Sequence, residues 1–369
     1  MGKEKWVEVY DMARFLKIKR KIAEKAEKSS FPVWYAYYRF RRFLKYEIHS
    51  DEYLVNRMYR NDFGRDCDLI DPKRFSEKVQ WLKLYERKDF HTVLADKYAS
   101  RDYISKNFGD EYLVPLMFVT DDWREIKPEN IPSEPCIIKP NNNCGKYHIV
   151  RNKDEMDWDQ VRMDARKWMA ENMYYRCQEW QYKNMKPYLL VEKLLHDQEG
   201  RIPNDYKLHF FDGELEFVYC SIDREGKNYR NIYDRDWNPL NFQLIAPKKY
   251  NPNIRGPEIP APKTFDKMKE MGRVVAKLFK YVRVDFYDVN GRLYFGEITL
   301  HHGSGTDHFY PDEYDFIYGD KIKLDLPNQG EVLVYDPHLI CISAVDISRM
   351  LHIKDHHGKE PEEVHRCAA

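Results

Sequence analysis

Two short segments close to residue 290 carry residue types that could hold a metal ion and phosphates. The first is Arg283-Val-Asp285 and the second is Gly296-Glu297-Ile-Thr299. Between them lies an Asn290-Gly291 pair, which is typical of tight hairpin turns. Side chains alternate between the two faces of a strand, so the register of the hairpin decides whether the two carboxylates meet. A three-residue loop over residues 290–292, with Gly291 in the left-handed position, would place Asp285 opposite Glu297. A strict two-residue turn would place them on opposite faces.

In the favourable register the hairpin offers the ligands that Mg²⁺ uses beside phosphates. Mg²⁺ prefers hard oxygen donors and usually takes only one or two carboxylates. Asp285 and Glu297 supply the carboxylates, Thr299 supplies a hydroxyl oxygen, and Arg283 adds a planar fork suited to a carboxylate or an oxyanion. An ordinary hairpin with a cross-strand ion pair is the alternative interpretation.

Upstream elements carry lysines that could bind the phosphates of a nucleotide. Residues 136–150 predict a hairpin in which Lys139 precedes a small polar loop, Asn141-Asn-Asn143-Cys-Gly145. The backbone amides of such a loop can cover phosphates, although no P-loop motif occurs in the chain. A second hairpin, over residues 205–219, carries Lys207 in the middle of a strand.

A helical region precedes these hairpins and contributes two more cations. The apolar pattern of residues 71–107 predicts helices, and Lys97 and Arg101 lie one helical turn apart within it. We therefore expect both side chains to face the same way.

The order of these motifs resembles that of the ATP-grasp superfamily. Within it, the chain is similar to the TupA-like amidoligases, of the teichuronopeptide-biosynthesis type, from bacterial surface-polysaccharide clusters. The resemblance spans roughly residues 70–315. It is carried by Phe75-Ser-Glu-Lys-Val-Gln-Trp-Leu-Lys-Leu-Tyr85, Asp96-Lys-Tyr-Ala-Ser-Arg101, Ile137-Ile-Lys-Pro140, Val191-Glu-Lys-Leu194, Asp205-Tyr-Lys207, Arg283-Val-Asp285 and Gly296-Glu-Ile-Thr299.

The resemblance implies roles for particular positions. Catalysis would rest on Arg283, Lys207 and Lys139. ATP would be bound by Lys97, Lys139, Asn141, Asn143, Gly145, Glu192, Lys193, Leu194, Asp205 and Lys207, with Asp205 at the ribose and the backbone of residues 193–194 at the adenine. Mg²⁺, as two ions, would be held by Asp285, Glu297 and Thr299, where Thr299 stands in place of the superfamily's common Asn. The substrates would meet Arg101, His302, Gly303, Ser304 and Gly305.

The fold class that the resemblance implies is α/β (α+β), in which two α+β subdomains clamp ATP. A helical, basic N-terminal extension precedes them. The expected segments are 1–70, the extension; 71–135, the N-terminal part of the ligase; 136–195, the small subdomain with the phosphate-covering loop; 196–320, the C-terminal subdomain with the magnesium site; and 321–369, a C-terminal extension.

Composition narrows the remaining possibilities. The formal net charge of zero argues against a nucleic-acid binder, and there is no apolar run long enough to span a membrane. Seven scattered cysteines without a CxxC pair favour a reduced, cytoplasmic setting. Residues 1–50 hold 13 Lys and Arg against 6 Asp and Glu, interleaved with aromatics. This segment predicts either an aromatic face packed on the domain or a peripheral contact with an anionic membrane or a biosynthetic complex.

The resemblance implies an ATP-dependent carboxylate–amine ligase that works through an acyl phosphate. Its substrates would be a uronic acid, free, nucleotide-linked or within a glycan, and an amino acid or amine, in surface-polysaccharide biosynthesis. A nucleotide-sugar-dependent glycosyltransferase is an alternative, for which the acidic pairs Asp121-Asp122 and Asp234-Arg-Asp236 are available. An ATP-grasp-type phosphotransferase acting on polysaccharide is another.

Overall fold

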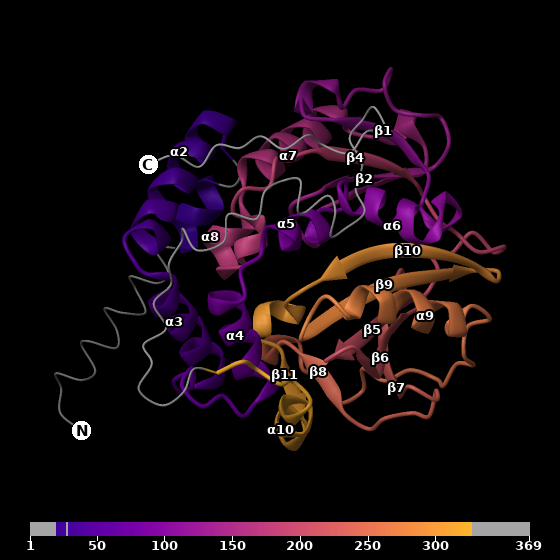
Figure 1. Ribbon diagram of the computed structural model, residues 1–369. Helices are drawn as coiled ribbons and strands as arrows, with labels where there is room; N and C mark the ends of the chain where they lie inside the picture. Colours follow the sequence, from indigo (N-terminus) through magenta and orange to yellow (C-terminus); the bar gives the residue numbers. More distant parts are fainter. Residues whose placement is uncertain (1–19, 27–28, 327–369) are drawn as a thin grey trace, which may run out of the picture.

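The computed structural model of the protein describes residues 20–26 and 29–326, which form two main antiparallel sheets with helices around them (Figure 1). Residues 1–19 and 27–28 of the predicted N-terminal extension lie outside the described part. So do residues 327–369, which make up most of the predicted C-terminal extension.

The smaller sheet has four strands in the order β1-β4-β2-β3 and presents Lys139 on one face. Trp168 and Ala165 of helix α7 pack against Ile138 on the other face. Its β2–β3 pairing confirms the hairpin predicted over residues 136–150. The bounds are β1 Leu116–Thr120, β4 Leu189–Lys193, β2 Cys136–Pro140, β3 His148–Val150 and α7 Trp158–Ala170. Because β1 precedes residue 136, this sheet draws on two of the expected segments.

The larger sheet has five strands in the order β10-β9-β5-β6-β7, and its two faces differ in chemistry. Leu208 and Val284 point to the face covered by helix α9, where Met268 and Val275 complete the core. Period-two alternation places the polar side chains of β5 and β9 on the opposite face, towards the smaller sheet. The bounds are β10 Arg292–Thr299, β9 Tyr281–Val289, β5 Asp205–Phe211, β6 Glu214–Ile222, β7 Tyr229–Asp234 and α9 Phe265–Ala276.

The remaining elements hold the two sheets in place. Helices α5 and α6 contact β10 and lie between the sheets, and α4 packs on α10 at one end of the larger sheet (Figure 1). Their bounds are α4 Phe75–Tyr85, α5 Asp89–Ala95, α6 Ser100–Phe108, α8 Met173–Cys177 and α10 Glu313–Asp320. A small sheet pairs β8 Gln243–Ile245 with β11 His308–Tyr310. Single helical turns are η2 Asp110–Tyr112, η3 Trp123–Glu125, η4 Lys153–Glu155, η5 Trp180–Tyr182, η6 Pro247–Lys249 and η7 His302–Gly305.

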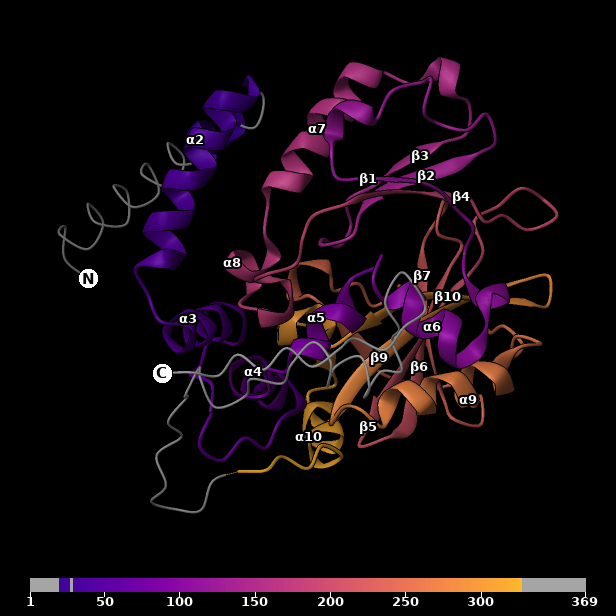
Figure 2. The same cartoon turned by 45° about the horizontal axis from the view of Figure 1, so that its top comes forward.

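The described part of the N-terminal extension forms α2 (Phe31–Arg42), the π-helical turn η1 (Phe43–Glu47) and α3 (Asp51–Phe63). Helix α2 lies beside α7 (Figure 2), and Trp34 is 1% exposed in their contact. The guanidinium of Arg166 covers the ring of Phe31 at 3.7 Å from its centroid. This confirms the packed-face interpretation for α2. No helix in the described residues combines the length and apolar character needed to cross a membrane.

The hairpin of β9 and β10 reaches the predicted pairing by a different route. Its turn is the two-residue Asn290-Gly291, with φ of 57° and 85°, and the expectation that such a turn would separate the two carboxylates is wrong. A β-bulge at Gly296 then adds one residue to β10 and shifts the register, which brings Glu297 opposite Asp285. A glycine suits the bulge because a Cβ there would approach the carbonyl oxygen of Asp285 to 3.0 Å.

Replacing Gly296 by alanine is expected to lower the free energy of unfolding by roughly 1–3 kcal/mol, because the new methyl group overpacks the bulge. Gly291→Asn is the matched control on the same hairpin, since Asn tolerates the left-handed conformation of the turn. Urea unfolding measures both variants. Equal losses in the two variants would show that the bulge does not depend on the glycine.

Candidate active site

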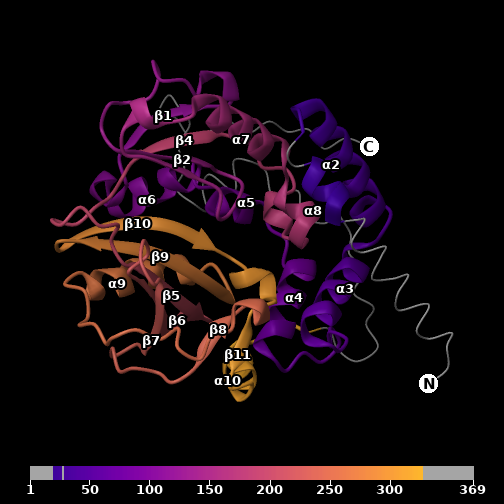
Figure 3. The same ribbon diagram turned by 180° about the vertical axis from the view of Figure 1, so that it is seen from behind.

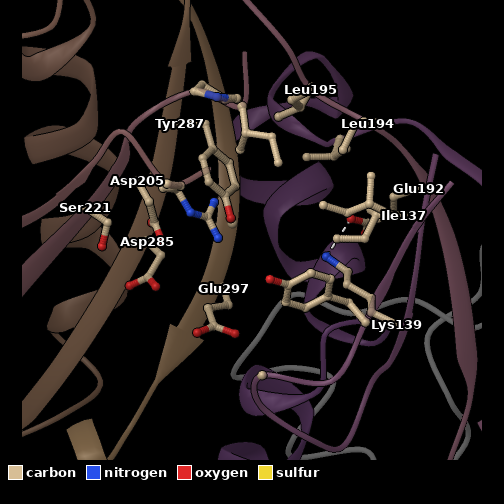
Figure 4. A pocket seen from close by; sticks show the side chains of 18 of the residues that line it. Ile137, Lys139, Glu192, Leu194, Leu195, Asp205, Ser221, Asp285, Tyr287 and Glu297 are labelled. Atoms are coloured by element: carbon tan, nitrogen blue, oxygen red, sulfur yellow. Dashed lines mark ion pairs between the residues drawn. The ribbon is translucent and has the colours of Figure 1, made fainter. Parts of the chain in front are cut away.

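A cavity of about 420 Å³ lies between the two sheets. The larger sheet contributes Asp205, Ser221, Asp285, Tyr287 and Glu297 on one side, and the smaller sheet contributes Ile137, Lys139 and Glu192 on the other, followed by Leu194 and Leu195 (Figure 4). One wall is therefore rich in carboxylates, and the other combines a lysine with apolar side chains. Lys97, Lys207 and residues 143–147 also line this cavity.

The guanidinium of Arg283 organises the carboxylates. Arg283 is 8% exposed, and its Nε and Nη2 donate to the two oxygens of Asp285 at 2.7 and 2.8 Å. Nη2 also donates to Glu297 Oε1 at 2.8 Å, while Nη1 lies 2.8 Å from His302 Nδ1. A buried charge requires such partners, because removal of one typically costs about 3–5 kcal/mol.

Three lysines from three separate elements pair with carboxylates that line the cavity. Lys207 Nζ lies 2.5 Å from Asp205 and 2.7 Å from Asp285, all within the larger sheet. Lys97 Nζ lies 3.2 Å from Glu297 Oε2, and Lys139 Nζ lies 2.6 Å from Glu192 Oε2 within the smaller sheet. Each of these three lysines therefore has a carboxylate partner.

The two facing carboxylates respond differently to their surroundings. Burial raises the pKa of Asp285 from its ordinary value, against the opposing pull of Arg283 and Lys207. Burial also acts to raise the pKa of Glu297, but the positive charges of Lys97 and Arg283 outweigh it and lower that pKa. Glu297 is therefore ionised at neutral pH, with a cation at each oxygen.

The donor set fits Mg²⁺ held jointly with phosphates. Asp285 and Glu297 offer hard oxygens from adjacent strands, and Asp205 Oδ1 is a buried oxygen without a hydrogen-bond partner. Among the described residues, no group of three or more His, Cys, Asp or Glu side chains is arranged to hold a metal ion. The protein thus offers a partial coordination sphere, which suits an ion that arrives with a triphosphate. Thr299 donates to Glu297 Oε1 at 3.3 Å and does not line the cavity.

The other end of the cavity suits a nucleobase. Val114, Ile137, Ile149, Leu194 and Leu195 give it apolar walls. The N–H groups of Lys193 and Leu194 donate to Pro115 O and Pro135 O. These two N–H groups are therefore engaged within the protein, and contact of the backbone of residues 193–194 with the base edge stays a prediction.

Several predicted site residues have partners that the sequence did not indicate. Asp205 lies 2.5 Å from Lys207 Nζ, which also pairs with Asp285 at 2.7 Å, and its contact with a ribose stays a prediction. Arg101 does not line the cavity, because its guanidinium bonds Glu192 at 3.3 Å and Val114 O at 2.9 Å. Lys97 lies in the turn between α5 and α6 rather than within a helix.

The polar loop after Lys139 is anchored in its first half. Asn141 is fully buried and bonds Asp96, Lys186 O and the N–H of Tyr188, so its amide is committed to structure. Asn143 and Gly145 do line the cavity, and the carbonyl of Asn143 accepts from Lys97 at 2.9 Å.

The predicted substrate loop lies behind Arg283. His302 is buried between Arg283 and Asp307, and its Nε2 lies 3.3 Å from Asp307. The carbonyls of Ser304 and Gly305 accept from Gln80 at 3.0 and 2.9 Å. These four described residues, 302–305, do not line the cavity between the sheets. Their contact with substrate stays a prediction.

The residues that line the cavity and that sequence reasoning missed include Lys146, Tyr147, Arg224 and Tyr287. Tyr287 shares a strand face with Arg283 and Asp285, so alternation could have found it. Arg224 comes from the turn after β6, where no pattern marks it. The acidic pairs Asp121-Asp122 and Asp234-Arg-Asp236 do not line the cavity, so nothing in the site favours the glycosyltransferase alternative.

The profile of the TupA-like ATPgrasp family matches residues 77–323, which is more than half of the chain. The chain belongs to this family. The match confirms the predicted ATP-grasp fold and places the chain in a class of ATP-dependent enzymes. Among proteins with curated descriptions, none matches.

Solved structures of ATP-grasp ligases resemble the chain at low identity. D-alanine–D-alanine ligase from Helicobacter pylori is 14% identical over 69% of this chain and 68% of its own, with a TM-score of 0.37. D-alanine–D-alanine ligase from Bacillus anthracis is 16% identical over 56% of this chain and 56% of its own, with a TM-score of 0.30. The ligase PsnB, complexed with minimal precursor, Mg and ADP, is 11% identical over 61% of this chain and 57% of its own, with a TM-score of 0.33. The chain thus spans little more than half the length of the latter two, and the family assignment rests on the profile match.

Lys207→Met is expected to destabilise the protein by about 3–5 kcal/mol at pH 7, because Asp205 and Asp285 lose their shared cation while 4% and 2% exposed. The pKa of Asp285, already raised, rises further, so the folded state binds a proton that the unfolded state releases. The free energy of unfolding of the variant then falls as pH rises above 3.8. Lowering the pH from 8 towards 5 is therefore expected to restore part of the free energy of unfolding that the substitution removes.

Urea unfolding between pH 5 and 8 measures this effect. Lys193→Met is the matched control, since its ammonium is half exposed and lies 3.6 Å from Glu134; it is expected to cost less than about 1 kcal/mol. A loss in Lys207→Met that is the same at pH 5 and pH 8 would contradict the assignment of Lys207 as the neutralising cation.

Proposed function

We propose that the protein is an ATP-dependent carboxylate–amine ligase that forms an amide through an acyl phosphate. The observation that carries the proposal is the meeting of Lys97, Lys139 and Lys207 with Asp285 and Glu297 in one cleft between two sheets. Lysines in such positions suit the oxygens of a triphosphate, and the carboxylates suit its metal.

Each residue takes a role that follows from its present partners. Lys139 and Lys97 bind the inner phosphates, and Lys207 binds the terminal phosphate. On binding, each lysine exchanges its carboxylate partner for a phosphate oxygen. Asp285 and Glu297 hold Mg²⁺, as one or two ions, which neutralises charge on the transferring phosphoryl group when bound. Arg283 keeps both carboxylates in position and adds positive charge where an oxyanion develops.

The chemistry requires no covalent enzyme intermediate. An oxygen of the substrate carboxylate attacks the γ-phosphorus of ATP, ADP leaves, and an acyl phosphate forms. The amine then attacks the acyl carbon, phosphate leaves with the bonding electron pair, and the amine's proton is released. Positioning and electrostatics supply the catalysis.

The finer identity of the substrates is part of the proposal. We propose a uronic acid or uronate-containing glycan as the carboxylate and an amino acid or amine as the acceptor, in surface-polysaccharide biosynthesis. The TupA-like family match supports this direction. We also propose a cytoplasmic location, in which residues 1–50 contact an anionic membrane surface or a biosynthetic complex. Exposed Val33, Phe40, Phe43, Leu44 and Ile48 support the contact.

An ADP-release screen of uronic acids against amino acids in the presence of Mg²⁺ tests the reaction. We expect ADP release only when both a carboxylate and an amine are present, and a loss of at least about 100-fold in Glu297→Gln, as for other electrostatic groups at a phosphoryl-transfer site. Glu258→Gln, an exposed carboxylate outside the cleft, is the control. Normal turnover by Glu297→Gln, or ADP release that needs no amine, would overturn the proposal.

A further inference from the structure

A second cavity, of about 360 Å³, lies where the N-terminal helices meet the ATP-grasp body. It is enclosed by α2 and η1 on one side and by α8 with the residues before it on the other, a region seen from behind in Figure 3. The residues around it are Trp34, Tyr37, Tyr38, Arg41, Arg42, Tyr46, Lys146, Glu171, Asn172, Met173, Tyr175 and Arg176.

This cavity combines aromatic faces with positive charge. Arg42 is held in place, because its guanidinium lies 3.9 Å from the ring centroid of Tyr175 and 2.5 Å from Glu47. Within the described part of the chain, Arg41, Arg176 and Lys146 form no salt bridge. Of the described residues that line the cavity, Glu171 is the only acidic one. An anionic ligand would therefore meet an excess of cations.

The walls of the cavity are fixed by specific contacts. Trp34 is buried and its ring stacks on Tyr38 at 5.3 Å, and the hydroxyl of Tyr38 accepts from the N–H of Asn172 at 3.2 Å. Tyr46 enters from the π-helical turn η1, a distortion that is frequent at functional sites. The aromatic faces are thus positioned before any ligand arrives.

The second cavity shares a lining residue with the cleft between the two sheets. Lys146 lines both cavities. Glu171 accepts from the side chain of Asn143 at 3.1 Å, the carbonyl of Asn143 accepts from Lys97 at 2.9 Å, and Lys97 pairs with Glu297 at 3.2 Å. A ligand in the second cavity would lie against the far side of the loop that faces the phosphates.

We propose that this second cavity binds an acidic saccharide, the sugar part of the carboxylate substrate. The proposal rests on the proposed ligase function and deepens it. The C–H faces of a sugar ring pack on aromatic faces, and guanidinium groups bind carboxylates or phosphates through paired hydrogen bonds. The N-terminal helices thus complete the substrate site, and Lys146 marks its junction with the triphosphate end.

Calorimetric titration of the full chain with three pairs of ligands tests this inference. The pairs are glucuronic acid with glucose, UDP-glucuronic acid with UDP-glucose, and an oligogalacturonate with a neutral oligosaccharide of equal length. They distinguish a free, nucleotide-linked or polymeric source. We expect at least one acidic member to bind about tenfold or more tightly than its neutral partner.

The matched variants are Arg41→Ala with Arg176→Ala in the cavity, and Arg39→Ala, an exposed arginine on the same helix that does not line it. The double variant is expected to weaken acidic-saccharide binding about tenfold or more, while Arg39→Ala leaves it unchanged.

Two results would overturn the inference: no acidic preference in any pair, or acidic binding unchanged in the double variant. Binding of Mg²⁺–ATP is measured in parallel and is expected to be equal in all variants. If the saccharide inference fails while Mg²⁺–ATP still binds and ADP release still needs an amine, the ligase proposal stands by itself. Failure of Mg²⁺–ATP to bind the wild-type chain would instead contradict the ligase proposal.

Discussion

The burial of one guanidinium constrains much of the site around it. Arg283 sits on a central strand at 8% exposure, and an unpaired charge there would be strongly destabilising. Its partners must come from the strand that it occupies and from the next one. Asp285 lies two residues along on the same face, but Glu297 reaches that face only because the bulge at Gly296 shifts β10 by one residue. A single backbone irregularity therefore brings the two carboxylates together.

The same pairing explains why lysines gather from elsewhere in the fold. Asp205, Asp285, Glu297 and Glu192 would repel one another in a cleft of low polarity, and cations from α5–α6, β2 and β5 offset that charge. A triphosphate brings negative charge that can pair with the lysines, and its metal brings positive charge that can pair with the carboxylates. The ion pairs thus balance the charge of the cleft with lysines and carboxylates, the groups that a triphosphate and its metal would pair with.

Much of this arrangement is written in local sequence patterns, and the rest depends on tertiary contacts. Period-two alternation places Lys207, Arg283 and Asp285 on one face, and turn chemistry predicts the hairpins at 136–150 and 205–219. The bulge at Gly296 could not be read from the sequence, because a glycine before Glu297 marks equally well a turn or a close packing contact. Lys207 pairs with Asp285, 78 residues away, and Asn141 bonds Asp96, 45 residues away; no local pattern specifies either contact. The packing of α2 on α7 depends likewise on distant side chains.

The central claim is that Asp285 and Glu297 form a metal site for a nucleotide rather than a structural ion pair with Arg283. Titration of ATP with and without Mg²⁺, in the wild-type chain and in Asp285→Asn, tests it most directly. The claim predicts that Mg²⁺ strengthens ATP binding by about tenfold or more in the wild type and that this advantage disappears in the variant, while metal-free ATP binds both about equally. An advantage of Mg²⁺ that is the same in both proteins would contradict the claim.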